Sequence, residues 1–233
     1  LGVRTSAGSR VRVEKETRFM MDTFVSISAV GPKEITAPAI SAAFDRIREI
    51  DVKFNALNPK SPVYAFNKKG VAITDPEIIN LVRVAVEISK KSDGAFDITV
   101  YPLTELWGFS GNSPKFPDDQ AIKNILNHVG YQHLILADGK LMKDNEKVGI
   151  DFGGIAKGYA LEQAAKILKS KGATQALIDA GGDIYALGKK GDRFWKIGIR
   201  NPRAADGDRQ DARVSSAQIS AEAILGYVEV ADH

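Results

Sequence analysis

The stretch from Val148 to Gly188 constrains the fold most, because it holds two glycine pairs, each beside a carboxylate. Asp151 ends a short apolar run just before the pair at 153–154, and the pair at 181–182 comes directly before Asp183. The pattern predicts a strand, a glycine turn, a helix, a strand and a second glycine turn. Because glycine has no Cβ, such a turn lets backbone N–H groups approach an anion at a helix N-terminus. The stretch therefore predicts a site for a phosphate-bearing ligand, with tight turns alone as the alternative.

Composition argues against several classes of function. The 32 basic residues are offset by 29 acidic ones, so the sequence gives no basic face of the kind that nucleic acid requires. The absence of cysteine excludes disulfides, thiolate zinc sites and a cysteine nucleophile, and three histidines make a histidine metal cluster improbable. No apolar run approaches the ~20 residues that span a bilayer, so no transmembrane segment is predicted.

Hydrophobic periodicity predicts the secondary structure of most of the chain. Helices are expected over 37–54, from a Thr74 cap to about Lys91, over 118–129 and from Lys157 to Gly172. Strands are expected over 17–30, 148–152, 175–180 and 195–200, with a hairpin over 134–142. Because strands mix with hairpins, the expected class is α+β, with antiparallel or mixed sheets backed by helices. Residues 1–16 are predicted as a flexible leader, 17–200 as one domain and 201–233 as an atypical tail.

Other candidate polar residues lie outside the glycine turns. Residues 55–69 are predicted to be a loop, in which Ser61 and Asn67 are either polar ligands or ordinary turn residues. After a turn at Asp93 and Gly94, alternation from Phe96 to Val100 suggests a strand that presents Asp97 on the opposite face, toward a cleft. The alternative is a hairpin turn followed by core aromatics. His128 is interpreted as a surface residue at a helix C-terminus.

Taken together, these stretches resemble the ApbE-like family of FAD:protein FMN transferases. The resemblance runs from about Phe19 to Arg200. It rests on Met21-Asp22-Thr23, on Ser61 to Asn67, on Asp93-Gly94-Ala95-Phe96-Asp97 continuing to Leu106-Trp107-Gly108-Phe109, and on Asp151 to Tyr159 with Gly181-Gly182-Asp183-Ile184. The fold that it implies is an ApbE-like, T-fold-related architecture.

The resemblance also implies an activity. Family members use Mg²⁺ to transfer the FMN half of FAD to a threonine hydroxyl of an acceptor flavoprotein, a subunit of a redox complex, and release AMP. Position by position, it implies that Met21, Ala95, Phe96 and Asp97 contact FAD, that Asp151 and Lys157 line the flavin site, and that Gly154 offers its carbonyl to Mg²⁺. It further implies a periplasmic or membrane-anchored lipoprotein, although no targeting segment is visible.

The sequence departs from the family pattern in two places. Asp22 stands where the family usually has glycine. The family's Ser-His-x-x-Asp-Pro and Ala-Asp-Ala-x-Ala-Thr segments, which complete the metal site and supply a base, are absent after Trp195. No catalytic residue is therefore assigned. The alternatives to a transferase are a non-catalytic FAD-binding protein and a truncated, inactive transferase.

Overall fold

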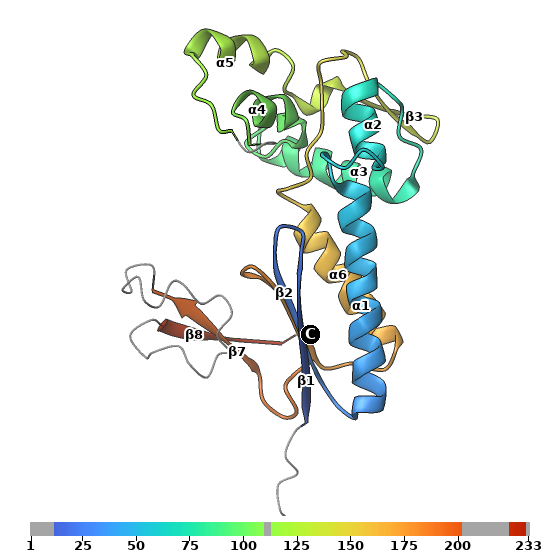
Figure 1. Cartoon of the computed structure of the whole chain (residues 1–233), viewed down its shortest axis with the longest axis vertical. Coiled ribbons are helices and arrows are strands. Elements are labelled where there is room, and N and C mark those ends of the chain that lie inside the picture. The colour runs from blue at the N-terminus through green and yellow to red at the C-terminus, as the bar shows by residue number, and fades with distance from the viewer. Residues whose placement is uncertain (1–11, 110–112, 202–223, 232–233) are drawn as a thin grey trace, which may run out of the picture. The chain divides into compact units, whose positions relative to one another are not determined.

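The computed structural model describes residues 12–109, 113–201 and 224–231, and Figure 1 shows its helices and strands. The chain divides into two compact units. Unit 1 comprises residues 1–47 and 158–233, and unit 2 comprises residues 48–157. Among the described residues every strand pair is antiparallel, and both units carry helices, so the predicted α+β class is confirmed.

Unit 1 is built on a four-stranded antiparallel sheet in the order β1-β2-β5-β6. Its strands are β1 (Val13–Met20), β2 (Thr23–Val30), β5 (Ala176–Ala180) and β6 (Asp183–Leu187). The alternation predicted for β2 is confirmed, because Val25, Ile27 and Ala29 are fully buried. In Figure 1 the helices α1 (Lys33–Phe54) and α6 (Ala156–Ser170) run along this sheet. The core of the unit therefore lies on the helix side of the sheet.

The two long helices bury the faces that the sequence predicts. In α1, which begins at Lys33 rather than Ala37, the predicted inner residues are buried: Ile40, Ala43, Phe44, Ile47 and Ile50. In α6 the same holds for Leu161, Ala164, Ala165 and Leu168. The division between the units falls after Ile47 in α1 and after Lys157 in α6.

The chain reverses at Met21 and Asp22, where the sequence predicts one continuous strand over 17–30. Both residues have positive φ, 51° and 57°, and connect β1 to β2 as a two-residue turn. Two consecutive left-handed residues make a type I′ turn, whose twist suits a hairpin. Methionine rarely adopts this conformation. The sequence therefore carries no clear turn signal here, and the prediction of a single strand is wrong.

The second glycine pair has the role of a tight turn. Gly181 and Gly182 have φ of 65° and 100°, and they connect β5 to β6. The Gly182 N–H donates to Asp179 Oδ1 at 2.9 Å. A Cβ at Gly181 would overlap the side chain of Thr23. For this pair, turn geometry and close packing account for both glycines.

Two elements extend into stretches predicted to lie outside the domain. β1 begins at Val13, so residues 13–16 of the predicted leader are strand. β8 (Ile224–Val230), within the predicted tail, pairs with β7 (Trp195–Arg200) in a separate two-stranded sheet. The rest of the predicted leader, apart from Arg12, lies outside the described residues. The predicted domain limits at residues 17 and 200 otherwise stay a prediction.

Unit 2 is mainly helical. After the end of α1 its elements are α2 (Pro62–Lys69), α3 (Pro76–Lys91), the 3-10 helix η1 (Ile98–Val100), α4 (Tyr101–Leu106), α5 (Asp119–Leu126), the 3-10 helix η2 (Tyr131–His133), and the hairpin of β3 (Leu134–Ala137) and β4 (Lys140–Lys143). The predicted α3, α5 and hairpin are confirmed. The cap of α3 is Asp75 rather than Thr74, because Asp75 Oδ1 accepts the N–H of Glu77 at 2.8 Å. α5 ends at Leu126 instead of Val129.

Three stretches of unit 2 differ from the predicted structure. Residues 62–69 form α2 rather than a loop, because Ser61 caps a short helix that buries Val63 and Phe66. Residues 98–106 form η1 and α4 where alternation suggests a strand. Residues 148–152 form no strand, because side chains take the place of a neighbouring strand as hydrogen-bond partners.

Among the helices that the structure describes, none is both long and apolar enough to cross a membrane.

Candidate functional site

The first glycine turn is a short, exposed bend that leads into α6. The N–H of Gly153 donates to Asp151 Oδ1 at 2.6 Å. Phe152 is buried, and its ring packs edge-on against Phe54 with centroids 5.0 Å apart. Gly153 and Gly154 are exposed. The buried ring thus anchors the turn while its two glycines face solvent.

Phe96 lies directly against this turn. A Cβ at Gly154 would lie 3.1 Å from Cε2 of Phe96, which is tighter than nine in ten real Cβ contacts. Gly154 is not among the residues with positive φ, so a larger residue there is opposed by the nearness of the Phe96 ring and not by backbone conformation. The contact makes two motifs that are far apart in the sequence neighbours in space.

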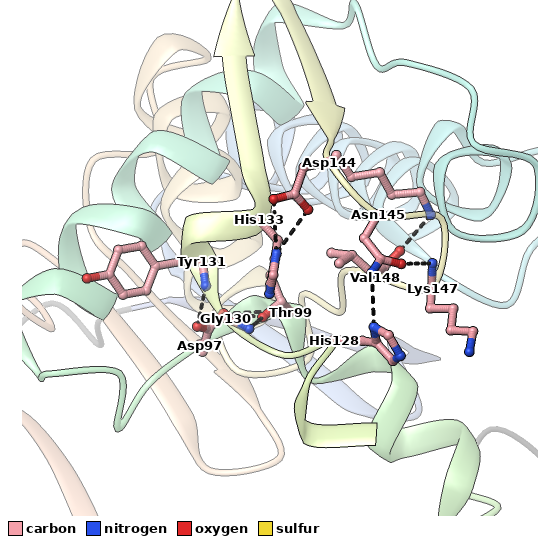
Figure 2. A network of polar contacts seen from close by, with 11 residues as sticks. Asp97, Thr99, His128, Gly130, Tyr131, His133, Asp144, Asn145, Lys147 and Val148 are labelled. Atoms are coloured by element: carbon pink, nitrogen blue, oxygen red, sulfur yellow. Dashed lines mark hydrogen bonds and ion pairs between the residues drawn. The ribbon is translucent and has the colours of Figure 1, made fainter. Parts of the chain in front are cut away.

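Asp97 organises the loop around Phe96 (Figure 2). Its Oδ1 accepts hydrogen bonds from the N–H and the hydroxyl of Thr99, at 2.8 and 2.7 Å, and its Oδ2 accepts the N–H of Tyr131 at 2.7 Å. The hydroxyl oxygen of Thr99, which is fully buried, in turn accepts the N–H of Gly130 at 2.7 Å. Both carboxylate oxygens of Asp97 therefore hold the start of η1 to the start of η2.

A second set of contacts in Figure 2 holds the segment that leads to the glycine turn. His133 Nδ1 lies 2.9 Å from Asp144 Oδ1, and Asn145 Oδ1 accepts the N–H of Lys147 at 2.9 Å. The Asn145 amide nitrogen lies 3.2 Å from Nδ1 of His128. His128, predicted to be a surface residue, thus has a side-chain partner.

Asn67 and Lys143 supply hydrogen bonds to the same segment. The Asn67 amide donates to the carbonyl of Ile150 and accepts its N–H, both at 2.8 Å. Lys143 Nζ donates to the carbonyl of Val148 at 2.6 Å and lies 5.0 Å from the centre of the Phe66 ring. Burial lowers the pKa of the Lys143 ammonium. These side chains set the path of the backbone just before Asp151.

Comparison with known proteins decides the family. The sequence model of the ApbE family matches residues 21–225, most of the chain. The chain belongs to the ApbE family. A curated relative, the FAD:protein FMN transferase of Klebsiella pneumoniae, is 30% identical over 217 residues, which cover 88% of this chain and 60% of the relative. The chain therefore spans only part of that relative's length.

Solved structures of ApbE proteins are similar in fold. The crystal structure of the ApbE protein of Thermotoga maritima matches with a TM-score of 0.81 at 30% identity, over 94% of this chain and 68% of that one. The flavinyl transferase ApbE of Pseudomonas stutzeri, in its apo form, matches with a TM-score of 0.71 at 29% identity, over 81% of this chain and 63% of that one. These matches agree with the α+β architecture described above.

Most of the residues that the ApbE resemblance singles out lie in unit 2. They are Ala95, Phe96, Asp97, Asp151, Gly154 and Lys157. The structure brings Phe96 against Gly154, leaves Ala95 exposed, and places Lys157 near the start of α6. Met21 belongs to unit 1, at the turn between β1 and β2, and its part in the site stays a prediction.

Several residues that shape this region were not predicted from the sequence to belong to the site. Thr99 could be found, because an acidic residue followed two positions later by threonine is typical of a local capping turn. Tyr131 and Lys143 could not, because they act through long-range backbone contacts. The sequence indicates Asn67 as a candidate polar ligand, but it does not indicate that Asn67 pairs with Ile150.

The glycine turn offers few ligands for a metal ion. In residues 12–109, 113–201 and 224–231, no group of three or more His, Cys, Asp or Glu side chains could hold one. The oxygens at the turn include the Asp151 carboxylate and the Gly154 carbonyl. Mg²⁺ is commonly held by one or two carboxylates together with phosphate oxygens and water. The turn therefore fits a Mg²⁺ ion that binds together with a phosphate ligand, and not one held by protein groups alone.

Proposed function

We propose that the chain transfers FMN from FAD to a threonine hydroxyl of an acceptor flavoprotein. The step forms a bond between the threonine Oγ and the FMN phosphorus, breaks the pyrophosphate bond, and leaves AMP and a proton. The observation that carries the proposal is the contact of Phe96 with Gly154, which joins two ApbE motifs at an exposed turn before a helix. The name of the Klebsiella pneumoniae relative, FAD:protein FMN transferase, supports the same activity.

The residues of the turn suit different parts of FAD. The exposed backbone of Gly153 and Gly154 precedes α6, and a helix N-terminus favours phosphate groups. The ring of Phe96 offers an apolar surface for the isoalloxazine, and Met21 is proposed to contribute another. Lys157 places a positive charge on the first turn of α6, suited to the pyrophosphate.

We also propose a structural role for Asp97, beside the contact with FAD that the resemblance implies. Both of its carboxylate oxygens accept hydrogen bonds from Thr99 and Tyr131. We infer that Asp97 contributes to FAD binding by fixing the loop that carries Ala95 and Phe96.

Magnesium is proposed to bind together with FAD. Gly154 would supply its carbonyl oxygen and Asp151 is the nearest carboxylate in sequence, with the remaining positions filled by phosphate oxygens and water. When bound, such an ion neutralises the charge that develops on the departing AMP. The chain's own residues bind and orient FAD and shape the exposed turn. The acceptor is proposed to be a flavoprotein subunit of a redox complex, and the location a periplasmic or membrane-anchored one.

The activity is tested by incubating the chain with FAD, Mg²⁺ and an acceptor that carries the target threonine. The proposal predicts a mass increase of one FMN group on the acceptor and an equal amount of AMP. An acceptor in which that threonine is replaced by valine is the matched control and should stay unmodified. An acceptor that gains no FMN group, with no release of AMP, would overturn the proposal for this chain.

A second candidate function is FAD binding without transfer, as in a truncated, inactive transferase. It is favoured by the lack of a carboxylate cluster among the described residues. It predicts FAD binding that is unaffected by EDTA, with no AMP. FAD affinity that falls when EDTA is added would count against it.

A further inference from the structure

The backbone before the glycine turn is held by a side chain in place of a strand. Ile150 is fully buried, so both of its backbone polar groups need partners inside the protein. Its N–H donates to Asn67 Oδ1, and its carbonyl accepts from Asn67 Nδ2, each at 2.8 Å. This is the double hydrogen bond that an adjacent strand would make with one residue. The Asn67 amide therefore fixes the register of this segment.

Asn67 is itself held in place by the helix that carries it. α2 begins at Ser61, whose hydroxyl oxygen accepts the N–H of Val63 at 3.1 Å and whose hydroxyl donates to the Lys53 carbonyl at 2.6 Å. Val63 and Phe66 are buried on the same helix. Ser61 thus ties the start of α2 to the end of α1, and Asn67 near its end reaches the segment before the turn.

The fit between Asn67 and this segment is tight. A Cβ at Gly149 would lie 2.6 Å from Cδ1 of Tyr101 and 3.3 Å from Oδ1 of Asn67. Only glycine at residue 149 lets the backbone pass between these side chains. On the other side of the pairing, the Asp151 N–H donates to the carbonyl of Ile98 at 2.7 Å. The backbone is therefore fixed at two successive residues directly before the turn.

We propose that Asn67 is a positioning residue, which sets the conformation of residues 149–154 and so the presentation of Asp151 and Gly154 to the ligand. The choice of FAD as that ligand rests on the proposed function. The positioning role itself rests on the paired hydrogen bonds of Asn67 with Ile150. It also gives a physical reason for the segment from Ser61 to Asn67: one end anchors α2 and the other end aligns the glycine turn.

The test compares Asn67→Ala with Asn80→Ala, in which an exposed asparagine of α3 in the same unit is changed in the same way. Amide hydrogen exchange is followed by NMR or by mass spectrometry of peptides covering 148–154. We expect exchange in this segment to accelerate at least tenfold in Asn67→Ala and to stay unchanged in Asn80→Ala. Exchange in α3 should be unchanged in both variants. Unchanged exchange over 148–154 in Asn67→Ala would overturn the proposal.

Calorimetric titration with FAD and Mg²⁺ separates positioning from loss of folded protein. A positioning role predicts that Asn67→Ala raises the Kd for FAD about tenfold while the number of sites per chain stays the same. A general folding defect instead lowers the number of sites and leaves Kd unchanged, which would contradict the proposal. If Asn67→Ala does not fold, Asn67→Asp is used, because it keeps an acceptor for the Ile150 N–H and puts a carboxylate oxygen in place of the donor to the Ile150 carbonyl. Faster exchange over 148–154 and a higher Kd for FAD are then expected in Asn67→Asp as well.

The two proposals can fail separately. If the unmodified chain does not bind FAD, the proposed function fails, and the exchange measurement alone decides the role of Asn67. If the chain binds FAD and Asn67→Ala binds it with unchanged Kd, the positioning role fails and the proposed function stands.

Discussion

The ring of Phe96 packs so closely on Gly154 that a Cβ at residue 154 would lie 3.1 Å from its Cε2. Gly154→Ala must therefore displace either the ring or the turn. If both belong to the FAD site, we expect the Kd for FAD to rise about tenfold, or about 1.4 kcal/mol. Titration calorimetry with FAD in the presence of Mg²⁺ measures this change.

Gly158→Ala is the matched control for that experiment. A Cβ at Gly158, in α6, would meet no atom within 4 Å. Alanine in a helix is more stable than glycine by about 0.5–1 kcal/mol, so this variant should melt at a higher temperature and keep its affinity for FAD. Equal affinities for the two variants would show that the contact with Phe96 has no part in binding.

Removal of the Asp97 carboxylate should destabilise the fold. Asp97→Ala leaves the N–H groups of Thr99 and Tyr131 without their acceptor. Unsatisfied buried donors cost about 1–3 kcal/mol each, and Thr99 is fully buried. We expect the free energy of unfolding in urea to fall by about 2–4 kcal/mol. The exposed Asp119→Ala should change it by no more than about 0.5 kcal/mol, and a similarly small change in Asp97→Ala would refute the structural role.

Lys53, Asp75 and Glu77 form an ion cluster with opposed pKa shifts. Lys53 Nζ lies 2.9 Å from Asp75 Oδ2 and 2.7 Å from Glu77 Oε2. Burial alone would lower the Lys53 pKa, but hydrogen bonds to Glu77 and Asp75 outweigh it and raise this pKa. Burial alone would raise the Asp75 pKa, but hydrogen bonds from Lys53 and from the N–H groups of Ile78 and Glu77 lower it.

The directions of these two pKa shifts determine how the stability of the fold depends on pH. The lowered Asp75 pKa stabilises the fold above the pKa of the unfolded chain, and this contribution is lost as the pH falls through the folded pKa. The raised Lys53 pKa stabilises the fold below the unfolded lysine pKa, and this contribution is lost as the pH rises through the folded pKa. Lys53→Met should therefore cost about 1 kcal/mol near neutral pH, and less at both extremes.

Urea denaturation from about pH 3 to about pH 11 measures this dependence. Lys166→Met, which breaks an exposed ion pair with Glu162, serves as the control and should show no such profile. A cost of Lys53→Met that is the same at every pH would contradict the assignment of the cluster.

The turn at Met21 and Asp22 predicts a stabilising substitution. Asp22 has φ of 57°, a conformation that glycine adopts without the clash that a Cβ brings. Asp22→Gly should raise the free energy of unfolding by about 0.5–1 kcal/mol, whereas Asp22→Val should lower it by at least about 1 kcal/mol. Thermal melts of the two variants give the comparison, and a lower melting temperature for Asp22→Gly would be inconsistent with this turn.

The amphipathic helices were predictable because their signal is local. The inner faces of α1 and α6 follow from apolar residues three and four positions apart, and the burial of Phe44 and Leu168 agrees with them. The hairpin of β3 and β4 carries an Asp138-Gly139 turn, which is typical of such connections.

The structure differs from the sequence-based prediction where long-range contacts or strained backbone conformations determine the local structure. The reversal at Met21 depends on a left-handed methionine, for which the sequence gives no signal. The helix α2 is stabilised by the burial of Phe66 and by the Ser61 cap. Without these contacts, the polar and turn-forming residues of this segment are typical of a loop. The extended segment at Ile150 lacks a partner strand because the partner is a side chain from residue 67. At the site, the sequence indicated Phe96 and Gly154 but not their contact, which exists only in the folded unit.

The most direct test of the account is the fate of FAD when the chain, Mg²⁺ and an acceptor flavoprotein with its target threonine are incubated together. Intact mass spectrometry follows the acceptor, and chromatography quantifies AMP. The account predicts one covalent FMN group per acceptor, equimolar AMP, and, at limiting FAD, slower formation of both products by Gly154→Ala than by Gly158→Ala. An unmodified acceptor without AMP, under conditions in which the chain binds FAD, would contradict it.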